Sequence, residues 1–284
     1  MPPPRVGAVL AYDGEDSIYV FGGERSGIAY SDLYRYDESA NAWEYVDVLS
    51  LSAEASYPEA RSHAAGVSYG KHLFVFGGRT VKGSGSVTSA LSDLWRFDME
   101  TQEWHSLDSL ATVASPKLQD TFLSGVYGHT AVRVGTKVYF FGGYCPSLGR
   151  TINDVMVLDL ETYDLHHMDD LLPPGTIAAN PQRRMFHTAV PHPTEPLLYV
   201  SSGYDEFSNE FIDVWVLNTA ELKWSVLTDK RAKAIGANGG LYMAASVSCD
   251  GAFMVTYGGQ GFGSLYSVFQ GLPLYDAPPA PGTL

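Results

Sequence analysis

Histidines are the side chains of this sequence that first raise the question of metal or acid–base chemistry. His63, His129 and His187 each stand near the start of a short apolar segment, and we align them as equivalent positions of a repeat. A side chain that recurs at one place of a repeat favours a structural hydrogen bond, because metal ligands must converge on a single point. The sequence therefore predicts no metal site from these three residues.

A second group of possible ligands lies further along the chain. His166 and His167 are adjacent and precede Asp169 and Asp170. Neighbouring residues of a strand point to opposite faces, so these histidines are poorly placed to share one ion. The chain also lacks the GxSxG, P-loop and HExxH motifs of common hydrolase, nucleotide and zinc sites. We expect no catalytic residue, no metal and no cofactor.

Composition narrows the classes of partner. The formal net charge of -14 repels phosphate backbones and anionic lipid surfaces, so we expect no nucleic-acid partner. No apolar run approaches the length of a membrane span, so we expect no membrane insertion. Two cysteines, Cys145 and Cys249, form neither a disulfide framework nor a zinc motif, which favours a cytoplasmic localisation. The abrupt start at "PPPR" leaves open that the chain is a fragment of a longer protein.

Five apolar runs that end in glycine are the main structural signal of the sequence, and they would form the scaffold for any functional site. They read "IYVFGG", "LFVFGG", "VYFFGG", "LYVSSG" and "MVTYGG", and their final glycines are Gly23, Gly78, Gly143, Gly203 and Gly259. A nearly continuous apolar run predicts a strand that is covered on both faces. Glycine at its end permits an unusual backbone dihedral or a close approach. We therefore treat these residues as structural: Gly22, Gly23, Gly77, Gly78, Gly142, Gly143, Gly203, Gly258 and Gly259.

Further strand signals surround each run. A frame such as "DLYRYD" or "DLWRFD" follows the first four, and six residues beyond it stands Trp43, Trp104, Leu165 or Trp224. A short strand candidate also precedes each run, so each unit holds four strands, A to D. Four short strands in a repeat of this length are typical of a β-propeller, in which large flat side chains fill the space between sheets. The three tryptophans are therefore expected in the interior.

The predicted fold class is an all-β propeller of five four-stranded antiparallel blades in one domain, 1–284. The approximate blade boundaries are 5–47, 60–108, 125–167, 184–228 and 240–277. In the last blade we take "SLYSVF", 264–269, as strand C and place Tyr275 where tryptophan usually stands.

These motifs resemble the kelch-repeat propellers over essentially the whole chain. The residues that carry the resemblance are the strand-B double glycines, the strand-C aromatics (Tyr34, Trp95, Trp215), the strand-D tryptophans, and an arginine or histidine that opens strand A (Arg5, Arg61, His63, His129, Arg184, His187). The resemblance implies a protein-binding module that uses the B–C and D–A connections. Met156 and Leu165, in the third blade, and Ser202 depart from the pattern.

Loop lengths also indicate that the side of the blades with the B–C and D–A connections binds partners. The B–C connections of the first four repeats hold 8 to 14 residues, whereas every C–D turn holds five. Function on a rigid scaffold usually lies in its variable loops. The candidate partner-binding residues, which include the arginine and aromatic types favoured at interfaces, are Arg25, Tyr30, Arg61, Arg79, Lys82, Tyr144, Arg150, Arg184, Tyr204, Asp205, Glu206, Phe207 and Glu210.

Three functions stay open at this stage. The first is a non-enzymatic substrate receptor or scaffold that binds another protein or a peptide segment. The second is a structural subunit of a larger assembly. The third is a metal-dependent kelch enzyme of the specifier-protein or galactose-oxidase type, but the Glu, Asp and His spacing of the former and a convincing copper ligand set of the latter are not found in this sequence.

Overall fold

The computed structural model describes residues 1–46, 57–82, 86–176, 180–227, 243, 245–249, 253–257, 260–261, 264–265 and 269–273. The chain divides into two compact units, Met1–Thr176 with Gln182–Met185, and Ile177–Pro181 with Phe186–Leu284. Each unit is described by itself. The prediction of one domain over 1–284 stays a prediction.

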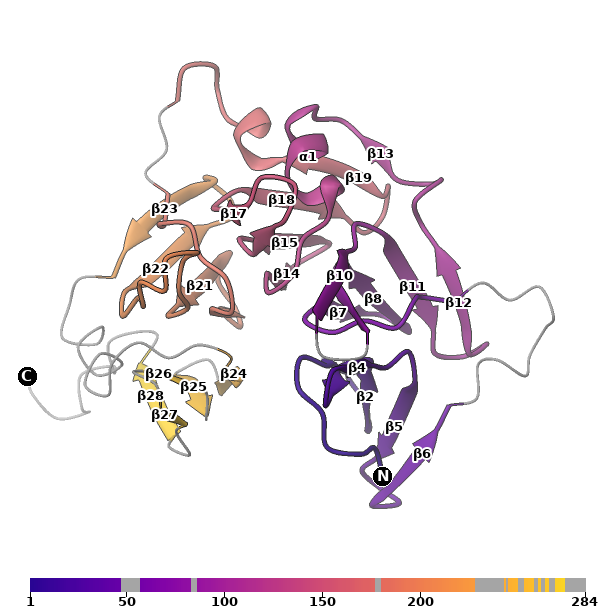
Figure 1. The fold of residues 1–284 in the computed structure, drawn as a ribbon. Helices are drawn as coiled ribbons and strands as arrows, with labels where there is room; N and C mark the ends of the chain where they lie inside the picture. Colours follow the sequence, from indigo (N-terminus) through magenta and orange to yellow (C-terminus); the bar gives the residue numbers. More distant parts are fainter. Residues whose placement is uncertain are drawn as a thin grey trace, which may run out of the picture. The chain divides into compact units, whose positions relative to one another are not determined.

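The first unit holds three antiparallel blades (Figure 1). Blade 1 contains β1 (Val9–Tyr12), β2 (Ser17–Phe21), β5 (Leu33–Asp37) and β6 (Ala42–Tyr45). Blade 2 contains β7 (Ala65–Tyr69), β8 (His72–Phe76), β11 (Leu94–Asp98) and β12 (Glu103–Ser106). Blade 3 contains β14 (Thr130–Val134), β15 (Lys137–Phe141), β18 (Val155–Asp159) and β19 (Asp164–His167). In each blade these strands are the A, B, C and D strands that the sequence predicts.

The second unit holds blade 4 and a smaller C-terminal sheet. Blade 4 contains β20 (Thr188–Pro191), β21 (Leu197–Ser201), β22 (Val214–Asn218) and β23 (Lys223–Val226). The C-terminal sheet contains β24 (Ala245–Cys249), β25 (Phe253–Tyr257) and β28 (Phe269–Pro273). An all-β propeller is therefore confirmed.

The prediction of five four-stranded blades is wrong. Four sheets carry the four-strand pattern, and the C-terminal sheet has three strands among the described residues. The predicted frame of this sheet is also displaced, because the strand that pairs with β25 is β28 and not 264–269. Ser264–Leu265 instead forms β27, which pairs with β26 (Gln260–Gly261) in a separate hairpin. Tyr275 and the glycine pair 258–259 lie outside the described residues.

The continuous apolar runs are explained by packing on both faces of strand B. In β8, Leu73 and Val75 join the core between blades 1 and 2, whereas Phe74 and Phe76 join the core between blades 2 and 3. All four are almost completely buried. Each such burial stabilises the fold by about 1.5–3 kcal/mol, so no polar face could be accommodated on this strand.

The strand-D tryptophans are not all equally buried. Trp104 is 6% exposed and packs on Phe21 and Phe97, with ring centroids 4.9 and 5.2 Å away. Trp224 is also buried, which confirms the prediction for these two residues. Trp43 is half-buried and contacts Tyr36 of its own blade. Blade 1 therefore leaves its tryptophan partly open to solvent.

The C–D turns share a hydrogen-bonding pattern that explains why each strand-C motif, such as DLWRFD, ends in Asp or Asn. In blade 2 the carboxylate of Asp98 accepts hydrogen bonds from the backbone N–H groups of Glu100 and Thr101. Gln102 then adopts a positive φ of 59°, which closes the turn. The same place in the other blades is taken by Asp37, Asp159 and Asn218. Asx side chains that bind the backbone ahead of them favour such turns.

The second glycine of each of the first three pairs makes a contact between blades. The N–H of Gly23 donates to the carbonyl of Arg61 over 2.8 Å, and Gly23 adopts a φ of 91°. Gly78 donates in the same way to Val126, and a Cβ on Gly78 would lie 2.9 Å from the carbonyl oxygen of Ser62. A side chain at these positions would collide with the neighbouring backbone. The first position is just as tight in blade 1, where a Cβ on Gly22 would lie 2.7 Å from the carbonyl oxygen of Arg61, although blade 4 has Ser202 there with a φ of 65°.

This contact also corrects the alignment of the histidines. The three acceptors of the second-glycine N–H are Arg61, Val126 and Arg184, which are therefore equivalent. His129 and His187 stand three residues beyond this position, but His63 stands only two beyond it. The three histidines are thus not equivalent. His63 shares its place, and its positive φ, with Gly128.

The D–A connection before blade 3 is folded into the core, which the sequence did not predict. It forms β13 (Thr112–Val113), the short helix α1 (Lys117–Asp120) and the 3-10 helix η1 (Phe122–Ser124). β13 adds to β19 as a parallel fifth strand. Leu118 and Phe122 are fully buried in the core between blades 2 and 3. The buried residues of this connection are consequently part of the scaffold, whereas Leu110, Lys117 and Gln119 stay exposed.

Candidate functional site

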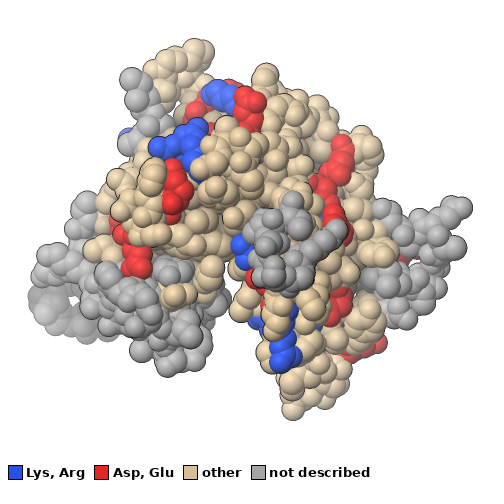
Figure 2. Space-filling model, viewed as in Figure 1, with Lys and Arg blue, Asp and Glu red and all other residues tan. Residues whose placement is uncertain are grey.

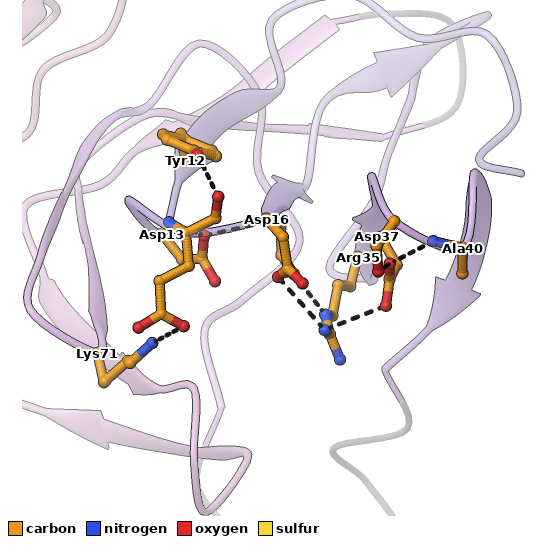
Figure 3. A network of polar contacts seen from close by, with 10 residues as sticks. Tyr12, Asp13, Asp16, Arg35, Asp37, Ala40 and Lys71 are labelled. Atoms are coloured by element: carbon orange, nitrogen blue, oxygen red, sulfur yellow. Dashed lines mark hydrogen bonds and ion pairs between the residues drawn. The ribbon is translucent and has the colours of Figure 1, made fainter.

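The two ends of the blades differ in how their polar side chains are used. At the end that carries the A–B and C–D turns of blade 1, Arg35 lies between Asp16 and Asp37, at 4.0 and 3.5 Å (Figure 3). Lys71 of blade 2 forms an ion pair with Glu15 at the same end. The charged groups of these turns are paired with one another, and the surface they form is mixed in sign.

At the opposite end, the B–C connections begin as small hairpins. β3 (Glu24–Arg25) pairs with β4 (Ile28–Ala29) in blade 1, and β16 (Tyr144–Cys145) pairs with β17 (Arg150–Thr151) in blade 3. The long Gly/Ser-rich connection of blade 2 contains β9 (Arg79–Lys82) paired with β10 (Ser86–Ala90). The residues directly after the second glycine are therefore held in extended backbone.

Those residues form a series of contacts across three blades. Glu24 follows Gly23, and its carboxylate accepts a hydrogen bond from the hydroxyl of Ser62. Nη2 of Arg79 donates to both carboxylate oxygens of Glu24, over 3.2 and 3.4 Å. The guanidinium of Arg79 lies over the ring of Tyr127, 5.1 Å from its centroid. Tyr127 in turn contacts Tyr144, with ring centroids 5.5 Å apart. We call Glu24, Ser62, Arg79, Tyr127 and Tyr144 the ladder.

Burial in the ladder changes the acidity of two side chains beside Arg79. Burial and the Arg79 charge lower the pKa of His63 to about 4, so this histidine is neutral at physiological pH. Burial also raises the pKa of Tyr127, although Arg79 acts in the opposite direction. The side chains of Glu24 and Arg79 are 16% and 17% exposed. A group of a partner can therefore reach this ion pair from one side.

Several predicted site residues of the first unit surround the ladder. Arg25 and Arg150 are exposed on their hairpins. Tyr30 is half-buried, and the guanidinium of Arg5 covers its ring, 4.6 Å from the ring centroid. The side chain of Lys82 lies outside the described part of the structure. Figure 2 shows basic and acidic side chains interspersed on the face in view, which agrees with a surface of mixed charge.

Two predicted site residues are buried, which corrects their assignment as surface donors. Arg61 is 1% exposed, binds Asp93 with both terminal nitrogens at 2.6 and 2.7 Å, and donates to the carbonyl of Gly77. Arg184 is 0% exposed. The sequence could not show this, because the frame aspartate that binds Arg61 stands 32 residues later.

The B–C connection of blade 4 presents a different surface. Asp205 accepts hydrogen bonds from the backbone N–H groups of Phe207 and Asn209, so this carboxylate builds the loop. Tyr204 stacks on Phe186, with ring centroids 5.8 Å apart. Phe207 is 77% exposed at the loop tip. Glu206 and Glu210 are half-buried. The exposed aromatic ring, rather than an acidic cluster, is the prominent feature of this loop.

Sequence reasoning missed Ser62 and Tyr127 and underrated Glu24. A usable signal did exist: Glu24, Arg79, Tyr144 and Tyr204 all follow the second glycine directly. In an extended strand their side chains take equivalent directions, so these positions can be compared from blade to blade. The partners Ser62 and Tyr127 come from strand A of blades 2 and 3, and only the fold brings them to this position.

A search of the described residues finds no group of three or more His, Cys, Asp or Glu side chains arranged to hold a metal ion. Within the same residues, no helix has the length and apolar character needed to cross a membrane.

Comparison with known proteins places the chain among β-propellers. Residues 18–266 match the model of the Attractin/LZTR1 β-propeller family. Over 240 residues, 79% of this chain, the sequence is 28% identical to host cell factor of Drosophila melanogaster. It is 24% identical over 218 residues to human kelch domain-containing protein 10, and 26% identical over 216 residues to acyl-CoA-binding domain-containing protein 5 of Arabidopsis thaliana, 74% of this chain in both cases.

The matched regions cover 14%, 44% and 30% of those three relatives, so the chain spans less than half of their length. The kelch domain relatives agree with the motifs of the sequence. Because the family model covers most of its length, the chain belongs to the Attractin/LZTR1 β-propeller family of kelch-type repeats.

Proposed function

We propose that this propeller is a non-enzymatic interaction module, a substrate receptor or scaffold, which binds a segment of another protein through its B–C connections. The observation that carries the proposal is the ladder, in which side chains at one repeat position, with Tyr127 between two of them, are linked across three blades at the end that bears the hairpins. Kelch domain relatives support an interaction role.

The chemistry of these connections suits a protein segment better than a small uniform ligand. Arg25 and Arg150 offer exposed guanidinium groups that can bind carboxylates through two parallel hydrogen bonds. Phe207 offers an exposed aromatic ring of the kind that anchors interfaces. An acidic segment would match the two arginines of the first unit, and an apolar side chain would match Phe207 of the second unit.

Charge reversal at exposed residues tests the proposal with little risk to the fold. The double variant Arg25→Glu with Arg150→Glu should weaken binding by about 2 kcal/mol or more, because both attractive charges become repulsive. The matched control reverses Glu38 and Lys137, which lie in a C–D turn and at an A–B turn. Partners captured by crosslinking from cells that express the whole gene product would be quantified for wild type and both variants. Loss with the control but not with the loop variant would contradict the proposal.

A permanent structural subunit would give a different result. Its complex would have one stoichiometry and would not exchange with added free protein. An interaction module should exchange, and labelled free protein followed by native mass measurement separates the two cases. Cytoplasmic localisation stays a prediction that fractionation of expressing cells can check.

A further inference from the structure

The ion pair between Glu24 of blade 1 and Arg79 of blade 2 differs from the buried Arg61–Asp93 ion pair of blade 2. Arg61 holds Asp93 with two nitrogens at 2.6 and 2.7 Å, whereas Arg79 reaches both oxygens of Glu24 through one nitrogen at 3.2 and 3.4 Å. Charge-assisted hydrogen bonds usually measure about 2.7–2.9 Å. The Glu24–Arg79 pair is therefore the looser one, and its arginine is the more accessible, 17% exposed against 1% for Arg61.

Arg79 is fixed for binding but is not fully used. Its backbone N–H and C=O pair with Ser62 at 2.8 and 3.0 Å, and its guanidinium lies flat over Tyr127. Its Nε is buried and has no acceptor among the residues that the structure describes. A guanidinium offers several donors in one plane, and a carboxylate of a partner would have to use the terminal nitrogens, because the buried Nε is out of its reach.

We propose that Glu24 is an internal competitor, which occupies Arg79 until an acidic side chain of the partner takes its place. This inference rests on the proposed function and specifies the partner as an acidic peptide segment. On release from Arg79, Glu24 keeps the hydroxyl of Ser62 as a donor. The competition suppresses weak acidic ligands, because each must first break the internal pair.

The charges around the pair favour an acidic partner over a basic one. Arg25 stands next to Glu24 on the exposed hairpin, and Arg79 lies behind it. A cation that approached Glu24 would therefore meet the like charge of Arg79, whereas a carboxylate that approached Arg79 would meet an attractive charge once Glu24 has moved.

The test uses the full chain and a fluorescein-labelled peptide of glutamates with blocked ends, with binding measured by fluorescence anisotropy at low salt. Glu24→Gln removes the competing charge and keeps the shape of the side chain. It should tighten binding of the acidic probe by roughly tenfold, because Arg79 no longer has a carboxylate to give up. Glu38→Gln makes the same change in net charge in an exposed C–D turn and should change binding less than about twofold, as expected for a distant surface charge.

Further measurements separate failure of the inference from failure of the proposed function. Arg79→Gln should abolish the gain that Glu24→Gln produces. If Arg79→Gln weakens binding of the acidic probe but Glu24→Gln does not tighten it, the competition is overturned while the loop surface stands. If neither substitution changes binding, the proposed function fails at this site as well. A lysine peptide that binds wild type and is lost in Glu24→Gln would overturn the acidic assignment. Thermal melts of each variant identify any that fail to fold.

Discussion

In blade 2 the aspartate before strand C is held by an arginine from the start of strand A, whereas in blade 3 it is held by a histidine from the end of strand D. Arg61 binds Asp93 in the first case. In the second, Nε2 of His167 lies 2.9 Å from Asp154. Nδ1 of His167 accepts from the N–H of Asp169, so the proton is on Nε2 and the ring donates to Asp154.

The difference follows from two substitutions in blade 3. Val126 stands where Arg61 stands in blade 2, and Leu165 stands where Trp104 stands. Both replacements are buried, in a core that the folded D–A connection enlarges. In both blades the aspartate before strand C needs a hydrogen-bond donor, and the strand-D position of Trp104 and Leu165 needs an apolar side chain. Neither position requires one fixed residue type.

The first test of this comparison removes the apolar strand-D side chain, Trp104 in blade 2 or Leu165 in blade 3. Trp104→Ala should lower the free energy of unfolding by about 3–5 kcal/mol, through lost contacts and a residual cavity. Leu165→Ala should cost about 2–5 kcal/mol, below the value for Trp104 because fewer atoms are lost. Urea unfolding followed by circular dichroism measures both. Trp43→Ala is the control, and a loss as large as that of Trp104→Ala would mean that half-burial in blade 1 has been misjudged.

The second test removes the donor. Arg61→Ala removes the donor to the Gly77 carbonyl and leaves the Asp93 carboxylate with the indole N–H of Trp95 as its remaining side-chain donor, and should cost about 3 kcal/mol. His167→Ala should cost about 1.5–3 kcal/mol, because the hydrogen bond that its ring donates to the Asp154 carboxylate is lost. Arg35→Ala removes an exposed, ion-paired arginine and should cost less than about 1 kcal/mol. Equal losses for Arg61 and Arg35 would show that burial does not set the strength of the pair.

The third test uses pH, because each blade contains a histidine held neutral by burial. Burial lowers the pKa of His129 to about 3 and that of His63 to about 4. Both values lie below the unfolded value of about 6.5, so this contribution to stability is complete above pH 6.5 and is lost as pH falls toward the folded pKa. Between pH 6 and 5 each histidine should reduce the unfolding free energy by about 1.4 kcal/mol per pH unit.

His129→Leu should therefore flatten the pH dependence of unfolding relative to wild type. Urea unfolding at pH 7, 6 and 5 gives the slope for each protein. His63→Leu should flatten it to a similar extent over this range, since both folded pKa values lie below it. Parallel curves for wild type and His129→Leu would show that folding does not lower the pKa of His129.

The sequence by itself determined the local design of each repeat. The glycine pairs, the alternating use of both faces in β8 and the polar C–D turns follow from backbone conformation and short-range hydrogen bonds, which a repeated pattern reports directly. The strands of blades 1 to 4 and the burial of Trp104 and Trp224 were predicted for that reason.

The tertiary structure decided every feature that depends on residues distant in the sequence. Arg61 was assigned to the surface because its partner Asp93 stands on another strand, and burial of a charge becomes acceptable only once that partner is in place. The ladder likewise combines Glu24, Ser62, Arg79, Tyr127 and Tyr144 from three blades, and no spacing in the chain reports their contacts. The three-stranded C-terminal sheet was misread because its degenerate frame allowed two registers, and only pairing with β25 selects Phe269–Pro273.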